Sequence, residues 1–118
     1  AVVFYNRLDA GMNLGSDVTT CYGAGLVGKD CLLITQAALD DASNPYNTRK
    51  NSGYPIGPIC NPGQVAIDAA AHPADGDWLF FVAINLKTGE TVFSKTNAEH
   101  EAAVVKYEQW LKDNPGAY

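Results

Sequence analysis

The sequence predicts an α+β fold that combines short helices with one antiparallel β-hairpin and a long ordered loop. The hairpin is expected over residues 78–95, where two runs of aromatic and β-branched side chains flank the turn-forming residues 87–90. A C-terminal helix is expected over residues 97–113, whose apolar side chains recur at helical spacing. Proline and glycine are frequent enough in residues 43–63 to exclude regular structure there.

The length and composition of the chain indicate one globular domain. The chain has 118 residues, of which 47% are hydrophobic, and 13 acidic residues against 8 basic ones give a net charge of −5. The longest apolar run, residues 78–84, is much shorter than the roughly 18 residues of a membrane span. The first residues also lack the basic and apolar segments of a signal peptide. We therefore expect neither a membrane span nor a leader in this sequence.

The N-terminal quarter is expected to contain two short helices. Residues 2–8 are apolar but have no capping side chain before them, which is typical of the second half of a longer helix. Gly11 suits the left-handed backbone position that follows a helix. A second short helix is expected to run to Tyr22, with Ser16 or Asp17 as its cap.

Capping side chains mark the starts of three further helices. Thr35 is expected to cap a short helix, and Asn61 followed by proline predicts a helix over residues 62–71. Thr96 and Glu99 have the spacing of a capping box at the start of the C-terminal helix. The side chains expected on the buried face of that helix are Ala103, Tyr107, Trp110 and Leu111.

The three cysteines leave two interpretations open. Cys21 and Cys31 flank a glycine-rich loop, and a disulfide between them would close a loop of about ten residues in an oxidising compartment. Alternatively, both are small buried side chains. Cys60 is expected to be a buried free thiol. Since there is no CxxC pair and only two histidines are present, we predict no metal site.

The basic residues argue against a nucleic-acid partner. Phosphate recognition needs clustered lysine and arginine side chains, and here they are spread along an acidic chain. The basic residues are Arg7, Lys29, Arg49, Lys50, Lys87, Lys95, Lys106 and Lys112.

The long loop carries the mixture of groups that sugar-binding sites use. Tyr46, Asn47 and Thr48 offer an aromatic face, an amide and a hydroxyl, and Asn61 and Gln64 add amides nearby in the sequence. Aromatic faces can stack on sugar rings while neutral polar groups bind hydroxyl and acetamido groups. The alternative is a self-bonded loop whose polar side chains satisfy local backbone groups. The residues alone leave both interpretations open.

A series of short motifs, taken together, resembles the MltG/YceG-type endolytic murein transglycosylases. The motifs occur in the family's order with similar spacing, from residue 2 to about residue 105. One departure is Gly15, where the family commonly has a glutamine whose amide could contact sugar. The matching residues are Val3-Phe4-Tyr5-Asn6-Arg7-Leu8, Gly11-Met12, Ser16-Asp17, Thr19, Tyr22-Gly23, Pro45-Tyr46-Asn47-Thr48, Gly53-Tyr54-Pro55-Ile56-Gly57-Pro58-Ile59-Cys60-Asn61-Pro62-Gly63, Ala69-Ala70, His72-Pro73-Ala74, Trp78-Leu79-Phe80-Phe81-Val82, Val92-Phe93-Ser94-Lys95-Thr96 and Glu99-His100.

The resemblance implies a lyase that cuts the β-1,4 bond between MurNAc and GlcNAc in peptidoglycan and leaves a 1,6-anhydroMurNAc end. In the family, a single glutamate serves as general acid and then as base. That glutamate lies upstream of the segment that corresponds to residues 3–8, so we expect it before Ala1, together with a LysM-like region and a membrane anchor. Residues 1–118 are then the C-terminal portion of the catalytic domain, inactive alone. The resemblance implies no cofactor.

The resemblance also suggests which residues line the glycan groove. We expect Ser16, Asp17, Tyr46, Asn47 and Asn61 to lie there. Asp17 could instead cap a helix or serve as a substitute general acid. Arg7 either contacts the substrate or braces Asp17.

The partners implied by the resemblance are peptidoglycan glycan strands at the extracytoplasmic face of the bacterial membrane. Two other classes of function stay open: a non-catalytic glycan-binding module, and an interaction module for cell-wall synthesis proteins. Surface uncovered by truncation is expected to allow non-native self-association through residues 1–30. Members of the family have also been labelled aminodeoxychorismate lyase, but nothing in the sequence resembles a pyridoxal-phosphate enzyme.

Overall fold

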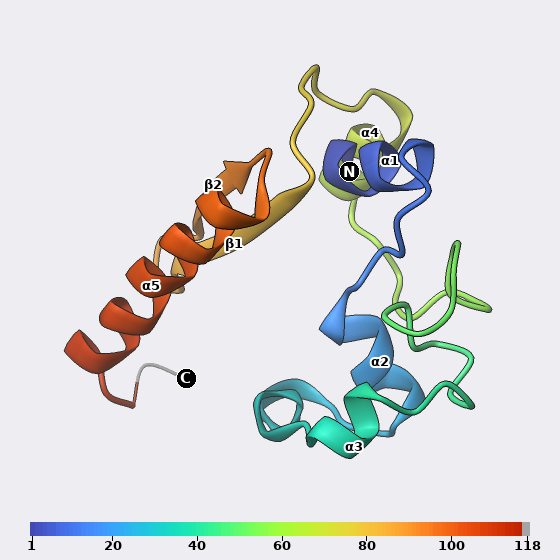
Figure 1. Ribbon diagram of the computed structural model, residues 1–118, viewed down its shortest axis with the longest axis horizontal. Helices are drawn as coiled ribbons and strands as arrows, with labels where there is room; N and C mark the ends of the chain where they lie inside the picture. Colours follow the sequence, from blue (N-terminus) through green and yellow to red (C-terminus); the bar gives the residue numbers. More distant parts are fainter. Residues whose placement is uncertain (117–118) are drawn as a thin grey trace. The chain divides into compact units, whose positions relative to one another are not determined.

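The computed structural model describes residues 1–116 and confirms the α+β class (Figure 1). Its elements, in chain order, are α1 (Val2–Asp9), α2 (Asp17–Gly23), the 3₁₀ helix η1 (Gly28–Leu33), α3 (Gln36–Leu39), α4 (Gln64–Ala71), β1 (Phe80–Asn85), β2 (Glu90–Ser94) and α5 (Asn97–Asp113). Within the described residues, no helix is both long and apolar enough to cross a membrane.

The chain divides into two compact units. One unit joins Ala1–Asn6 to the chain from Ala69 onward, and the other comprises Arg7–Asp68. The predicted hairpin and C-terminal helix both belong to the first unit. The groove residues predicted from the sequence all belong to the second.

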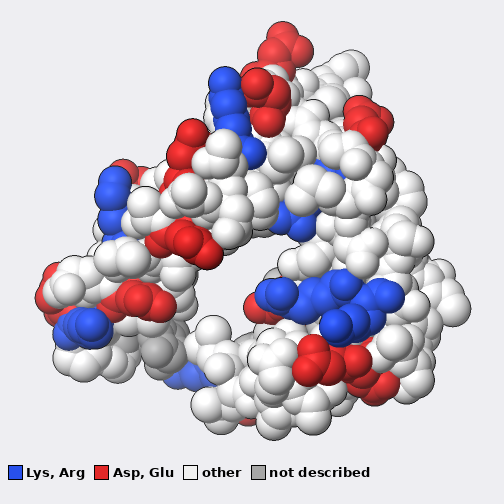
Figure 2. All heavy atoms as spheres, viewed as in Figure 1, with Lys and Arg blue, Asp and Glu red and all other residues white. Residues whose placement is uncertain are grey.

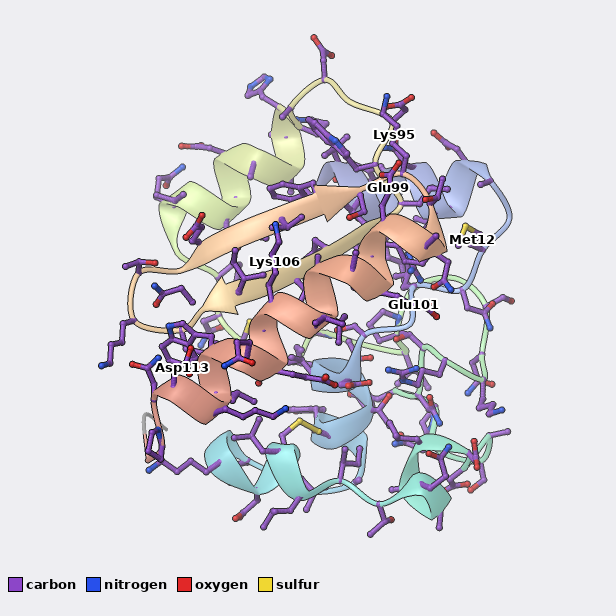
Figure 3. All side chains as sticks on the ribbon, turned by 60° about the vertical axis from the view of Figure 1, so that its left-hand side comes forward. Met12, Lys95, Glu99, Glu101, Lys106 and Asp113 are labelled. Carbon is purple, nitrogen blue, oxygen red and sulfur yellow. A yellow bond between two sulfur atoms is a disulfide. The ribbon has the colours of Figure 1, made fainter. Side chains whose placement is uncertain are left out.

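In the first unit, α5 lies along the antiparallel pair β1–β2 (Figures 1 and 3). Phe80 of β1 faces the helix, because its ring stacks on the His100 imidazole with centroids 5.2 Å apart. The next residue, Phe81, faces the opposite side of the sheet, where its ring meets that of Phe4 at 5.7 Å. The hairpin is therefore covered by α5 on one face and contacted by α1 on the other.

The predicted start of α5 is confirmed. Thr96 is the N-cap, and its hydroxyl accepts a hydrogen bond from the Glu99 backbone N–H at 3.2 Å. The Glu99 carboxylate accepts from the backbone N–H of Lys95 at 3.1 Å, one residue earlier than in a standard capping box. The predicted buried face is confirmed at Ala103, which is 4% exposed.

The end of α1 is also as predicted. Gly11 has a φ of +71°, and its N–H donates to the carbonyl of Leu8. The Met12 N–H donates to the carbonyl of Arg7 at 2.8 Å. These two bonds form a Schellman motif, which ends the helix and starts the loop that leads to α2.

Two details of the sequence prediction are wrong. The helix expected over residues 62–71 begins at Gln64, because its first turn closes from the Gly63 carbonyl to the Ile67 N–H. Gly63 thus takes the capping position, which glycine tolerates better than a helical position, and Asn61 lies outside the helix. Cys60 is exposed rather than buried, because it lies in the irregular loop before that helix.

Candidate functional site

The candidate site lies in the second unit, where α2 meets the loop that follows α3. Asn47 stands at the centre of this contact and is 0% exposed. Its side-chain N–H groups donate to the carbonyls of Leu39 (3.1 Å) and Asp41 (2.9 Å). Its side-chain oxygen accepts from the Thr20 hydroxyl (3.2 Å) and the Arg49 N–H (3.0 Å). The amide is therefore fully engaged within the protein and holds the loop in place.

A second asparagine ties the same loop to the C-terminal end of α2. The Asn44 side chain donates to the Thr20 carbonyl at 3.1 Å, and its oxygen accepts from the Tyr46 N–H at 3.0 Å. A Cβ on Gly23 would lie only 1.9 Å from the Asn44 side-chain oxygen, so the close approach of loop and helix requires a residue without a side chain. Asn44 thus fixes the backbone of Tyr46 against α2.

Thr48 forms hydrogen bonds with the start of α2. It is 2% exposed, and its hydroxyl accepts a hydrogen bond from the Ser16 N–H at 2.9 Å and pairs with the Thr19 hydroxyl at 2.9 Å. Ser16 occupies the N-cap position, but its side chain makes no capping bond. Ser16 is half-buried, and its hydroxyl has no capping role.

The side chain of Tyr46 is half-buried between α2 and the proline-rich loop. Its ring lies edge-on to the ring of Tyr22, with centroids 4.8 Å apart and planes at 62°. Its hydroxyl oxygen lies 3.3 Å from where a Cβ on Gly57 would be. The tyrosine predicted to face the glycan is therefore held on both sides by the protein.

Asp17, at the first position of α2, forms an ion pair with Arg49. The guanidinium Nε and Nη2 approach one carboxylate oxygen at 2.7 and 2.6 Å, and about half of each side chain is exposed. Arg7 lies nearby and donates to the carbonyls of Asn13 and Leu14. Burial, and secondarily the positive charge of Arg49, lowers the pKa of Arg7. The guanidinium groups of Arg7 and Arg49 and the carboxylate of Asp17 therefore lie near one another at the start of α2.

Four of the five predicted site residues lie where α2 meets the loop that follows α3: Ser16, Asp17, Tyr46 and Asn47. Asn61 is in the same unit, in the exposed segment that precedes α4. Tyr22 and Arg49 contact predicted site residues but were not predicted as part of the site. The signals for them were slight: Tyr22 belongs to a matching motif, and Arg49 directly follows the Tyr-Asn-Thr motif.

The disulfide interpretation of the cysteines holds in the structure. Cys21 and Cys31 are bonded, with Cα atoms 5.6 Å apart. The bond joins α2 to η1, directly beside Tyr22 in the sequence.

The histidine, cysteine and acidic side chains of the described residues form no candidate metal site. No three His, Cys, Asp or Glu side chains of residues 1–116 are placed to share a metal ion. His100 belongs to the first unit, where its buried Nδ1 atom has no hydrogen-bond partner. On the face shown in Figure 2, acidic and basic side chains are interspersed.

A separate groove lies in the first unit, between α5 and the hairpin. Its volume is about 510 Å³, and Lys106 and Asp113, labelled in Figure 3, line it along the helix. None of the predicted groove residues lines it. Its other lining residues are Ile84, Asn85, Glu90, Val105, Gln109 and Trp110.

Comparisons with known proteins agree with the resemblance seen in the sequence. The model of the YceG-like family matches residues 1–106. The endolytic murein transglycosylase of Bacillus subtilis (strain 168) is 46% identical over 107 residues, covering 91% of this chain and 28% of that protein. Its namesake in Streptococcus pneumoniae serotype 2 is 32% identical over 108 residues, covering 91% of this chain and 19% of that protein.

A solved structure has the same fold over the matching part. A crystal structure of a yceG-like protein from Listeria monocytogenes superposes with a TM-score of 0.74 at 44% sequence identity. The match covers 85% of this chain and 31% of the Listeria chain. Sequence, family model and fold thus agree, and this chain belongs to the YceG-like family.

Proposed function

We propose that this chain is the C-terminal part of the catalytic domain of an endolytic murein transglycosylase and supplies part of its glycan groove. The observation that carries the proposal is the braced Tyr46-Asn47-Thr48 segment, which holds a half-buried tyrosine against Tyr22 of α2, the helix whose first residue, Asp17, forms the half-exposed pair with Arg49. The two named relatives, which this chain matches over 91% of its length, support the same activity. The proposed ligand is a peptidoglycan glycan strand on the outer side of the cell membrane.

Within this groove, the predicted residues take different roles. Ser16, Asp17, Tyr46 and Asn61 present hydroxyl, carboxylate, phenol and amide groups for sugar hydroxyl and acetamido groups. Asn47 acts as a positioning residue, because all of its hydrogen bonds are made within the protein. It sets the place of its neighbour Tyr46.

The proposed reaction is an intramolecular displacement at the MurNAc anomeric carbon. The bond between C1 and the glycosidic oxygen breaks, and that oxygen takes a proton from a carboxylic acid. The C6 hydroxyl oxygen of the same sugar bonds to C1 and gives its proton back to the carboxylate, so no water is consumed. We assign this acid to a glutamate outside the 118 residues. Asp17 is less suited, since its carboxylate forms an ion pair with Arg49 and accepts a hydrogen bond from the Arg49 Nε.

Product analysis on peptidoglycan tests the proposal. The longer protein that contains this chain, incubated with purified glycan strands, is expected to give internal cleavage with 1,6-anhydroMurNAc ends, detected by mass spectrometry. The 118-residue chain alone is expected to bind the strands without cleaving them. Tyr46→Ala in the longer protein should lower the rate by at least about tenfold, the loss of one well-placed contact worth about 1.4 kcal/mol. Tyr54→Ala is the matched control, because Tyr54 is 68% exposed.

Three outcomes would contradict the proposal. Cleavage by the isolated chain would mean that the acid lies within it. Products that have gained water would indicate hydrolysis instead of transglycosylation. Binding by the longer protein without any cleavage would favour a non-catalytic glycan-binding module.

A further inference from the structure

Tyr22 is an aromatic side chain that the proposed reaction leaves without a role. It lies near the C-terminal end of α2 and is 47% exposed, although its ring packs against that of Tyr46 at 4.8 Å. Single exposed aromatics are common on protein surfaces and need no explanation. Tyr22 differs because it adjoins Tyr46, a predicted substrate contact, and because the backbone on both sides of it is held in place.

The backbone on each side of Tyr22 is fixed by its neighbours. Cys21 is tied to η1 by the disulfide. On the other side, the space that a Cβ of Gly23 would fill is occupied by the Asn44 side chain. Since residue 22 lies between a covalent crosslink and this close approach, its Cα position is set independently of its own side chain.

Tyr46 is fixed relative to Tyr22 through the same asparagine. Asn44 donates to the carbonyl of Thr20 in α2 and accepts from the N–H of Tyr46. One side chain thus spans from the helix that carries Tyr22 to the backbone of Tyr46. The two rings are held as a pair before any ligand arrives, which lowers the ordering cost of binding.

We infer that Tyr22 and Tyr46 together form an aromatic platform for one N-acetylhexosamine ring, and that Tyr22 is a further substrate-positioning residue. The inference rests on the proposed function. The exposed part of the Tyr22 ring offers an apolar surface to the C–H groups on one face of a pyranose, and the Tyr46 edge limits where that sugar can sit. Tyrosine suits this role because it couples a large rigid apolar ring with a polar tip.

Binding of peptide-free peptidoglycan glycan strands to this chain tests the inference, measured by isothermal titration calorimetry. Tyr22→Leu keeps apolar bulk but removes the ring, and is expected to weaken binding about two- to tenfold, as for loss of an aromatic stacking contact. Tyr22→Phe keeps the ring and should bind within about twofold of the wild type, because the inference assigns stacking to the ring and not to the hydroxyl. Tyr54→Leu, an equally drastic change at an exposed tyrosine, should leave binding unchanged.

The outcomes separate this inference from the proposed function. Wild-type binding that Tyr46→Ala weakens but Tyr22→Leu leaves intact would overturn the platform and spare the proposed function. A folded wild-type chain that does not bind the strands would overturn both. If Tyr22→Leu also lowers the urea midpoint of unfolding, its loss of binding is compared with that of Tyr22→Phe. A Tyr22→Phe variant that loses as much binding as Tyr22→Leu would contradict stacking by the ring.

Discussion

Thr20 and Asn47, which are 27 residues apart in the sequence, share a hydrogen bond of 3.2 Å, and both are 0% exposed. Together with Thr48, they are the largest fully buried side chains among the described residues. The contact between α2 and its loop is therefore centred on polar groups. Buried polar groups of this kind specify one arrangement, because any other would leave donors or acceptors unpaired.

Asn47→Ala should be strongly destabilising. It leaves the buried Thr20 hydroxyl and the partly buried carbonyls of Leu39 and Asp41 without their present partner. We expect the free energy of unfolding to fall by about 3 kcal/mol, measured by urea denaturation. Asn97→Ala, at an exposed position of α5, serves as the control and should change it by less than about 0.5 kcal/mol. Equal effects of the two variants would show that the network does not stabilise the fold.

The α+β class, the hairpin and α5 could be predicted because each is marked by local signals. The strands β1 and β2 are rich in aromatic and β-branched residues, and Thr96 with Glu99 marks the helix start. Such signals act within a few residues. They are therefore readable without knowledge of the rest of the chain.

The arrangement of the site could be predicted only in part. The Tyr46-Asn47-Thr48 motif is visible in the sequence, but the choice between sugar contacts and local bonding depends on partners such as Thr20 and Leu39. The partners of Asn47 lie up to 27 residues away, and no periodicity encodes that pairing. For the same reason, the contact between Tyr22 and Tyr46 became visible only in the structure.

Removing the disulfide should lower stability without changing the fold. The bond between Cys21 and Cys31 closes a loop of about ten residues and so restricts the unfolded chain. Replacing both cysteines by serine should therefore lower the free energy of unfolding by about 2–3 kcal/mol. Urea denaturation of the double variant measures this. Cys60→Ser is the matched control, since that thiol is exposed. A mass that does not rise by two hydrogen atoms on reduction would show that the bond is absent in the purified chain.

The cap of α5 offers a test in the first unit. Thr96→Ala removes the hydroxyl that accepts the Glu99 N–H, and should cost about 1 kcal/mol in the free energy of unfolding. Thr96→Ser keeps an oxygen in the same position and is expected to retain most of that stability. If serine and alanine were equally destabilising, the loss would come from the threonine methyl group instead of the cap.

Asp41 should make part of the stability of the second unit depend on pH. Hydrogen bonds from the Ser43 hydroxyl, and then from the Ser43 N–H, lower the pKa of the Asp41 carboxyl below its ordinary value of 3.8, and desolvation opposes them only in part. Because the folded pKa lies below the unfolded one, the contribution is fully present above pH 3.8. It is lost as the pH falls through the folded pKa.

Urea denaturation between neutral pH and pH 2 measures this contribution. Asp41→Asn and Ser43→Ala should both be less stable than the wild type at neutral pH, and both differences should shrink in acid, because the wild-type carboxyl then loses the charge that Ser43 binds. Ser52→Ala, at an exposed serine of the following loop, should run parallel to the wild type throughout. A Ser43→Ala difference that stays constant down to pH 2 would mean that Ser43 stabilises the turn through its backbone conformation and not through the carboxylate.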